Sequence, residues 1–339
     1  MEIKLKTLTP LWTGGVDQTC DRLHETGLIG SLRWWYEALV RGLGGYACDP
    51  TAEGRCEYDP KKPEPPEKQI CAACYLFGCT GWARLFRLKI FEENLNPEKI
   101  HFYTTLEANK GWLSRIFKNQ DSNGLSGQFR LDFVGRGKDD EYAFSQLAWT
   151  LEFAAKCGGL GAKLQHGFGQ VELITVLTSY TSHAERDLRD RLDAFKLGTN
   201  NPDHPSRQQF ISILKNVLPV NPVIRAILNS CTIGDVPSDY IPCAFDLRYK
   251  GGSIEGKQLG FRQWLIGKRW RRNEICKLMG ETRAGRNEDR SASRICFSMP
   301  WKGREGTYTL RVFGFVPPTM ELKKVEEAVE DYLNELFGE

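Results

Sequence analysis

The feature that most limits the fold of this chain is a glycine-rich stretch at residues 158–171, GGLGAKLQHGFGQV. Two Gly-apolar-Gly units, at 159–161 and 167–169, enclose five residues that include Lys163 and His166. Glycine lets backbone N–H groups approach an anion closely, so a glycine loop beside a lysine usually contacts phosphate. If the loop binds phosphate, the phosphate belongs either to a nucleotide or to a nucleic-acid chain.

Neither common nucleotide-binding glycine motif fits the loop. A Walker loop needs Lys-Ser/Thr directly after its last glycine, but Phe168 follows Gly167; a Rossmann fingerprint needs a third glycine where Leu164 stands. Both motifs follow a strand, whereas this loop follows a helical pattern. An extended RNA chain suits the loop better, and a plain connector with tight turns is the alternative. The loop residues expected to contact RNA are Gly159, Gly161, Lys163, His166, Gly167 and Gly169.

The apolar pattern predicts a split βαβ, or ferredoxin-like, unit around this loop. The expected elements are a strand at 1–9, a helix at 27–45, strands at 82–91 and 129–134, a helix at 141–156 and a strand at 171–177. A second copy is expected from strands at 243–250, 294–299 and 308–316 and a helix at 320–337. No fourth strand follows that helix. We therefore predict an α+β fold of two tandem ferredoxin-like domains, the second incomplete or irregular.

The predicted domain boundaries follow from these patterns. The first domain takes residues 1–178, with a Cys/Pro-rich insertion at about 45–80; a partly helical connector takes 179–235, and the second domain 236–339. With 41% hydrophobic and 26% charged residues, the composition is that of a globular protein, and no apolar run is long enough to span a membrane. The first residues do not read as a signal peptide, and eleven cysteines then favour a reducing compartment, so we expect the cytoplasm.

Charge is spread unevenly along a chain whose formal net charge is only +3. Residues 248–311 hold 16 lysines and arginines against 6 acidic residues, whereas residues 318–339 hold 2 against 7. The basic segment favours a local polyanion contact, and pairing with the acidic tail is the alternative. Arginines bind phosphate bidentately and stack on bases. The candidates for RNA contact here are Arg262, Lys268, Arg269, Arg283, Arg286, Arg290 and Arg294.

The segment TGLIGS opens the first predicted helix with two glycines and a serine. Free N–H groups at a helix start bind phosphate, so Gly27, Gly30, Ser31 and Arg33 are further RNA candidates, with a plain helix cap as the alternative. Trp34 lies at the edge of the apolar stripe, either as a core or partner-facing residue or as a base-stacking platform.

Cysteines gather in the insertion. Cys71-x-x-Cys74 has zinc-knuckle spacing, and Cys48 and Cys56 could complete four ligands. The interval between the pairs is irregular, so a structural zinc and a set of small core residues are both open.

Several segments resemble the RAMP superfamily of CRISPR proteins. The glycine loop between a helix and the last strand resembles its signature loop. LTPLWTGG, ETGLIGSLRWWYEALVRGLGG, CYLFGCTGWARLFRL and ASRICFS resemble one branch, the first RAMP subunit (subunit one) of the type III-B (Cmr) RNA-targeting effector complex. The resemblance covers both halves of the chain and is less specific in the second.

The resemblance implies an RNA-binding subunit of a ribonucleoprotein for antiviral defence. It would bind guide and target RNA near the guide's 3′ end, beside other Cmr subunits, and slicing would belong to a different, repeated subunit. One alternative is a RAMP endoribonuclease that trims guide RNA, with His24 as a second imidazole beside His166. The other is a scaffold whose basic surface meets acidic proteins.

Overall fold

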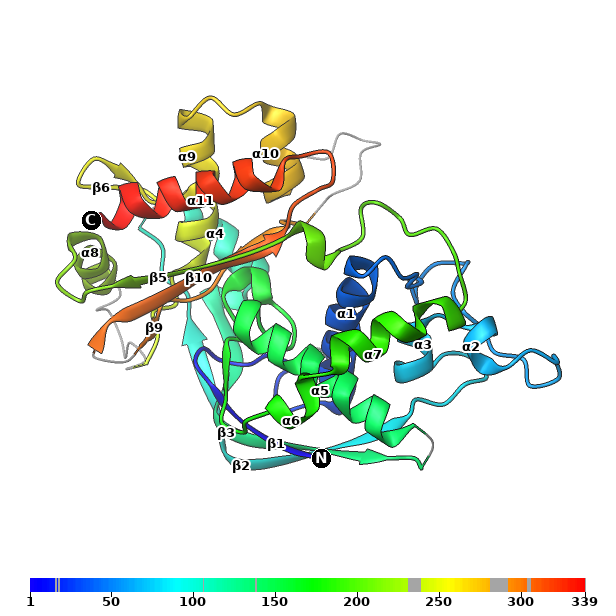
Figure 1. Ribbon diagram of the computed structural model, residues 1–339. Coiled ribbons are helices and arrows are strands. Elements are labelled where there is room, and N and C mark those ends of the chain that lie inside the picture. The colour runs from blue at the N-terminus through cyan, green and yellow to red at the C-terminus, as the bar shows by residue number, and fades with distance from the viewer. Residues whose placement is uncertain are drawn as a thin grey trace.

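The structure, a computed structural model, describes residues 1–339 except 16, 18, 106, 138, 231–238, 281–291, 304–305 and 339. Its first unit is a four-stranded antiparallel sheet in the order β2-β3-β1-β4. The strands are β1 (Glu2–Thr7), β2 (Phe86–His101), β3 (Asp121–Gly135) and β4 (Val171–Leu173). Helices α1 (Glu25–Gly42) and α5 (Asp140–Cys157) cover one face of this sheet (Figure 1). This order of strands and helices is the ferredoxin-like arrangement.

The second unit repeats this arrangement without its last strand. Its sheet has the order β5-β10-β8. Strand β9 also pairs with β10, at a different position along it from β8. The strands are β5 (Phe210–Val217), β8 (Ile295–Phe297), β9 (Trp301–Lys302) and β10 (Tyr308–Phe315). The helices are α8 (Pro222–Ser230) and α11 (Leu322–Phe337). Among the described residues no strand pairs with the free edge of β5, so the predicted fold, including the incomplete second unit, is confirmed.

The other elements are short and lie between or beyond the strands. In the first half they are α2 (Pro66–Gln69), α3 (Ala72–Phe77), α4 (Glu107–Ile116), α6 (Thr178–Thr181) and α7 (Ala184–Arg191). Between α8 and β8 lie the π-helical turn η5 (Asp246–Lys250), the hairpin of β6 (Ser253–Ile254) and β7 (Lys257–Gln258), and helices α9 (Phe261–Gly267) and α10 (Arg272–Met279). Among the described residues, no helix combines the length and the apolar character needed to cross a membrane.

Two strand assignments in the second half need correction. The predicted strand at 243–250 is wrong, because this segment is helical and its apolar residues, including Phe245 and Leu247, are buried. A short apolar run cannot by itself distinguish a buried strand from a buried helical turn. The first strand of the second sheet is instead β5, which lies inside the predicted connector at 179–235. The three predicted domain ranges stay a prediction, but the second sheet begins before residue 236.

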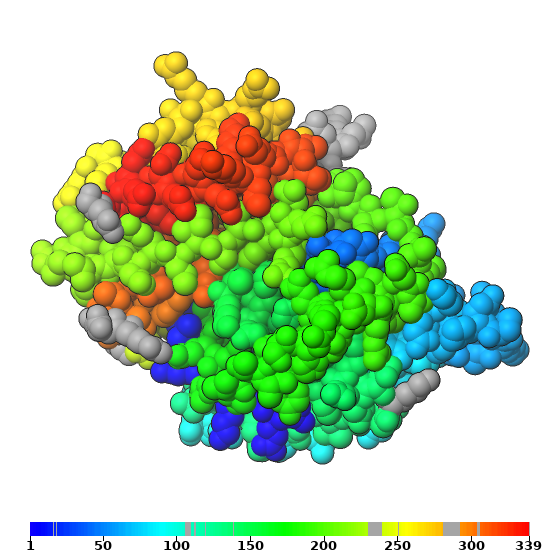
Figure 2. All heavy atoms as spheres, viewed as in Figure 1, coloured from blue at the N-terminus to red at the C-terminus, as the bar shows by residue number. Residues whose placement is uncertain are grey.

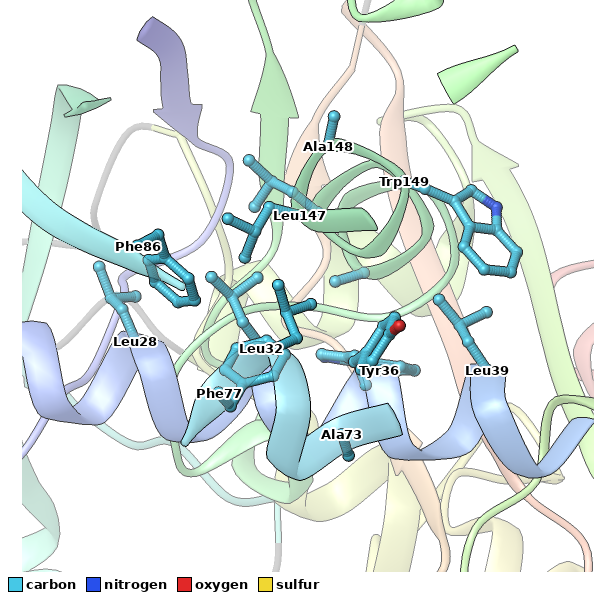
Figure 3. Packing of buried hydrophobic residues seen from close by; sticks show 14 of the residues in the cluster. Leu28, Leu32, Tyr36, Leu39, Ala73, Phe77, Phe86, Leu147, Ala148 and Trp149 are labelled. Atoms are coloured by element: carbon cyan, nitrogen blue, oxygen red, sulfur yellow. The ribbon is translucent and has the colours of Figure 1, made fainter. Parts of the chain in front are cut away.

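The core of the first unit forms around α1. Leu28, Leu32, Tyr36 and Leu39 recur every three or four residues, so they share one helical face, and each is buried. Figure 3 shows them packed against side chains from three other elements. The labelled partners are Ala73 and Phe77 of α3, Phe86 of β2, and Leu147, Ala148 and Trp149 of α5. The apolar side of α1 therefore faces the core of the first unit.

The two units meet through aromatic side chains and one buried arginine. Phe313 and Phe315 of β10 belong to the core of the first unit, where the Trp35 ring lies 5.9 Å from the Phe315 ring. Arg311, on the same face of β10, is 5% exposed. Its Nη1 donates to the carbonyls of Ala155 (3.0 Å) and Gly158 (3.2 Å) and to Gln170 Oε1 (2.8 Å). Burial lowers the pKa of Arg311 to about 10, so the side chain is charged near pH 7.

We predict that Arg311→Met lowers the free energy of unfolding by about 3 kcal/mol, because it leaves buried carbonyls at the end of α5 without a donor. Urea denaturation followed by circular dichroism measures this. The control is Arg186→Met, which removes a 74% exposed arginine side chain from α7 and should change stability by less than about 0.5 kcal/mol. Equal stability of the two variants would show that Arg311 does not hold the units together.

Candidate nucleic-acid interface and cysteine cluster

A cavity of about 520 Å³ opens between the two units, and we call it the inter-unit cavity. The first unit contributes residues from α1 and from the exposed part of the glycine loop, and the second unit contributes the start of β8 and the end of β10. Its lining residues include Ser31, Trp34, 161–165, Pro205, 292–294, Cys296 and 313–315. Both halves of the chain therefore form the wall of this cavity.

Helix α1 presents two polar or aromatic side chains to this cavity. Ser31 Oγ accepts a hydrogen bond from the N–H of Gly161 (3.1 Å), which ties the helix to the loop. Trp34 is 39% exposed, and its ring meets the rings of Trp35 and Phe315 edge to face, at 4.8 and 5.2 Å. No atom lies within 4 Å of the Cβ position at Gly30, so space is open on this side of the helix.

The helix begins earlier than the TGLIGS motif suggested. Its first residue is Glu25, so Gly30 and Ser31 lie in the second turn, where their N–H groups follow the first four free donors. Gly27 packs against the side chain of Thr13, with its Cβ position 3.1 Å from Thr13 Cβ. Ser31 meets the cavity through its side chain, and contact of Gly27, Gly30 and Ser31 with RNA stays a prediction.

The glycines of the loop allow the chain to fold tightly on itself. Leu160 N–H donates to Gly169 O (2.9 Å), and Gly169 N–H donates to Pro10 O (2.8 Å). Gly161 and Gly169 have φ values of +81° and +84°, and a Cβ at Gly161 would lie 2.5 Å from Trp12 O. The N–H groups of Gly161, Gly167 and Gly169 all have acceptors inside the protein, and Gly159 is buried. These glycines serve packing, and the half-exposed residues 161–165 are the part that reaches the cavity.

Lys163 and His166 differ in their access to solvent. The Lys163 ammonium lies 4.1 Å from the centre of the Trp12 ring and donates to Ser122 Oγ (3.2 Å). Burial lowers the pKa of this lysine. His166 is 8% exposed and meets Phe117 edge to face at 4.9 Å. Burial, followed by the nearby charges of Arg248 and Lys163, lowers the pKa of His166 well below its usual value.

A buried, neutral histidine does not suit the roles expected of His166. Stacking on a base and acting as general base both need an imidazole that a bound RNA can reach. Lys163 lines the inter-unit cavity, and its contact with RNA stays a prediction. His166, by contrast, packs in the interior.

The basic candidates of the second unit are dispersed. Arg294 lines the inter-unit cavity and donates to the carbonyl (3.0 Å) and Oδ1 (3.1 Å) of Asp203. Arg262 donates to Gly280 O, Lys268 pairs with Glu335 of the acidic tail, and Arg269 is exposed after α9. Of these four, only Arg294 lines the cavity. Arg283, Arg286 and Arg290 lie outside the described residues.

Arg33 points away from the cavity and toward the cysteines. Its side chain is 15% exposed and donates to Glu37 Oε1 (2.9 Å), Gly78 O (2.8 Å) and Cys74 Sγ (3.1 Å). The expectation that Arg33 contacts RNA beside Ser31 overlooked the 100° turn between successive helical residues, which places the two on different faces. Arg33 is a partner of the cysteine cluster in this fold.

The four predicted cysteines come together at the root of the insertion, which protrudes from the first unit in light blue (Figure 2). Cys48, Cys56, Cys71 and Cys74 are all buried, and their sulfur atoms lie within 4.8 Å of one another. The Sγ atoms of Cys48 and Cys74 are 3.4 Å apart, which is too far for a disulfide bond. This distance is close to the sulfur–sulfur separation of about 3.8 Å in a tetrahedral site with Zn–S bonds of about 2.3 Å. The cluster could hold a metal ion.

Sequence reasoning missed the wall that the second unit gives to the cavity. Phe313 and Phe315 were assigned only to a strand. Arg311, Phe313 and Phe315 follow one another at intervals of two residues along β10, so all three lie on one face of the strand. This period of two was the available signal.

A family model for the RAMP superfamily matches residues 4–172, about half of the chain. Comparison with curated proteins gave no match. Among solved structures, apo Cmr1 from Pyrococcus furiosus is 12% identical, with a TM-score of 0.49 over 94% of this chain and 88% of that chain. A chain from the type III-B Cmr-beta complex bound to cognate target RNA is 13% identical, with a TM-score of 0.48 over 99% of each chain. The family match runs from β1 into β4 and contains the glycine loop, and the chain accordingly belongs to the RAMP superfamily.

Proposed function

We propose that this chain is a non-catalytic, RNA-binding subunit of a type III-B CRISPR (Cmr) effector complex, which binds guide or target RNA near the guide's 3′ end. Membership of the RAMP superfamily supports the general assignment, and the branch-specific motifs in both halves support the type III-B complex. The observation that carries the proposal is the inter-unit cavity, where an exposed tryptophan face lies beside basic side chains.

The cavity offers the two contacts that single-stranded RNA needs. The exposed ring of Trp34 provides a surface on which a base stacks. Arg294 is held by the exposed carboxylate of Asp203, an ion pair that a phosphate can replace at small cost. Lys163, from the glycine loop, lines the same wall. Base stacking by Trp34 and phosphate contact by Arg294 come from different units, so an RNA strand would cross their junction.

The absence of a catalytic role is part of the proposal. His166 is buried with a lowered pKa, and His24 is paired with Asp21 (Nε2 to Oδ1, 2.9 Å) at the start of α1. A guide-trimming endoribonuclease would need an accessible imidazole opposite a second acid or base. Purified protein should leave single-stranded RNA intact both without metal and with magnesium, and cleavage that disappears in His24→Ala would favour the endoribonuclease.

We predict that Trp34→Ala weakens binding of single-stranded RNA by about fivefold or more, the equivalent of one lost stacking contact. Arg294→Ala should also weaken binding and reduce the slope of log K against log salt by about 0.7, because one phosphate contact is lost. Fluorescence anisotropy with labelled RNA over a series of KCl concentrations measures both. Arg186→Ala on α7 is the control and should leave affinity and slope unchanged. If neither cavity variant differs from the control, the RNA site lies elsewhere.

We further propose that Cys48, Cys56, Cys71 and Cys74 bind a structural zinc ion. Four buried sulfurs within 4.8 Å of one another suit zinc, and the ion would tie the proline-rich part of the insertion to α3. The two sulfur pairs come from segments about fifteen or more residues apart in the chain, and such cross-links stabilise a region that has little core of its own.

Protein purified without chelator should contain one zinc per chain by elemental analysis. The double variant Cys71→Ser/Cys74→Ser should lose the metal and become sensitive to proteolysis between residues 49 and 70, whereas Cys157→Ser, outside the cluster, should keep both properties of the native protein. A native protein free of zinc and resistant to proteolysis would argue for cysteines that serve only packing.

A further inference from the structure

A zinc ion bound by four thiolates carries a net charge of −2, and the cysteine cluster would bury that charge. All four cysteine side chains are at most 2% exposed. A buried charge is strongly unfavourable unless an opposite charge and hydrogen bonds compensate it. A zinc site of this composition therefore needs a cation close to its sulfur atoms.

Arg33 is the cation that the fold places there. Its Nη2 lies 3.1 Å from Cys74 Sγ and 4.0 Å from Cys48 Sγ. The other nitrogens of the same guanidinium are fixed, Nε by Glu37 Oε1 and Nη1 by the carbonyl of Gly78. The planar group cannot turn without breaking these bonds, so the N–H on Nη2 is directed at the sulfur atoms.

A second arginine, Arg41, supports this arrangement from about two turns further along α1. Glu37 Oε2 accepts from Arg41 Nη2 (3.3 Å), and Arg41 also donates to the carbonyl of Ala47, next to Cys48. The Glu37 and Arg41 side chains are 7% and 5% exposed. Two arginines and one glutamate leave one net positive charge beside the cysteines. Neutral thiols would leave that charge without a counter-ion, whereas a zinc tetrathiolate supplies one.

We propose that Arg33 is the counter-ion of a zinc tetrathiolate at Cys48, Cys56, Cys71 and Cys74, and that Glu37 and Arg41 position it. The inference rests on the zinc site proposed above and adds a residue outside the ligand set that controls metal affinity. Hydrogen bonds to coordinating groups typically change metal affinity by about 10- to 100-fold. It also assigns Arg33 a role on the side of α1 that faces away from the inter-unit cavity.

The test compares zinc affinity in intact protein variants by equilibrium competition with a chromogenic chelator. Arg33→Gln removes the charge and retains a donor of similar length; Arg33→Lys retains the charge but not the planar group. The control is Arg55→Gln, one residue before Cys56, which removes the same charge from a 51% exposed side chain. Cobalt-loaded samples report the sulfur environment through the sulfur-to-cobalt charge-transfer band, and circular dichroism checks folding.

We expect Arg33→Gln to lower zinc affinity by about tenfold or more, Arg33→Lys to lie between it and the native protein, and Arg55→Gln to match the native protein. The charge-transfer band should shift in Arg33→Gln and shift less in Arg33→Lys, with its four-sulfur character kept in both, and it should stay unshifted in Arg55→Gln. Equal affinities and unshifted bands for Arg33→Gln and Arg55→Gln would overturn the proposed role of Arg33 and leave the zinc site standing. A native protein that binds neither zinc nor cobalt through four sulfurs would overturn both. If Arg33→Gln does not fold, Arg33→Lys decides: unchanged affinity and band would then reject the role.

Discussion

Helix α1 is surrounded on most sides, and the 100° turn from each helical residue to the next sends neighbouring side chains into different environments. Leu32 enters the core of the first unit, Arg33 meets the cysteines, and Trp34 opens onto the inter-unit cavity. Arg33, Glu37 and Arg41 recur every four residues and so follow one edge of the helix. A shift or rotation of this helix would disturb the core, the cysteine cluster and the cavity together.

The junction between the units depends on the same helix. Trp35 donates from its indole nitrogen to Gly159 O (2.8 Å) and packs against Phe210 and Phe315 of the second sheet. Arg311 binds the end of α5 and Gln170 from the other side of the loop. The glycine loop is thus held between α1 and β10, and its close packing explains why residues without side chains occupy it. Anion contact by N–H groups is not needed to account for these glycines.

Much of the fold could be predicted from periodicity, because the long apolar stripe of α1 and the clear alternation of β1 are strong signals. The position of the glycine loop between α5 and β4 was also predicted correctly. The segment at 243–250 could not be assigned, because its short apolar run fits a strand as well as a buried helical turn. Strand β5 was hidden among turn residues, although FISILKNV alternates.

The candidate site was harder to predict than the fold, because contact across the units cannot be read from local spacing. The cysteine set could be predicted from the Cys71-x-x-Cys74 spacing and from the residue type of Cys48 and Cys56, since metal ligands share a chemical type. Arg33 was predicted to contact RNA because it stands two residues after Ser31 in the sequence. The helical geometry places the two side chains on different faces of α1. Lys268 was a candidate for RNA contact, with pairing to the acidic tail as the alternative, and the structure pairs it with Glu335 of that tail.

The buried residues of the insertion lie at its root, where it joins the first unit. The four cysteines and Tyr75 are buried there, whereas residues 60–64 at the tip are exposed. Mutations at the tip therefore change little that the core depends on, and evolution can vary its length and sequence more freely than those of the root. For the same reason, the tip is a practical position for attaching a fluorophore or an affinity handle without loss of the native fold.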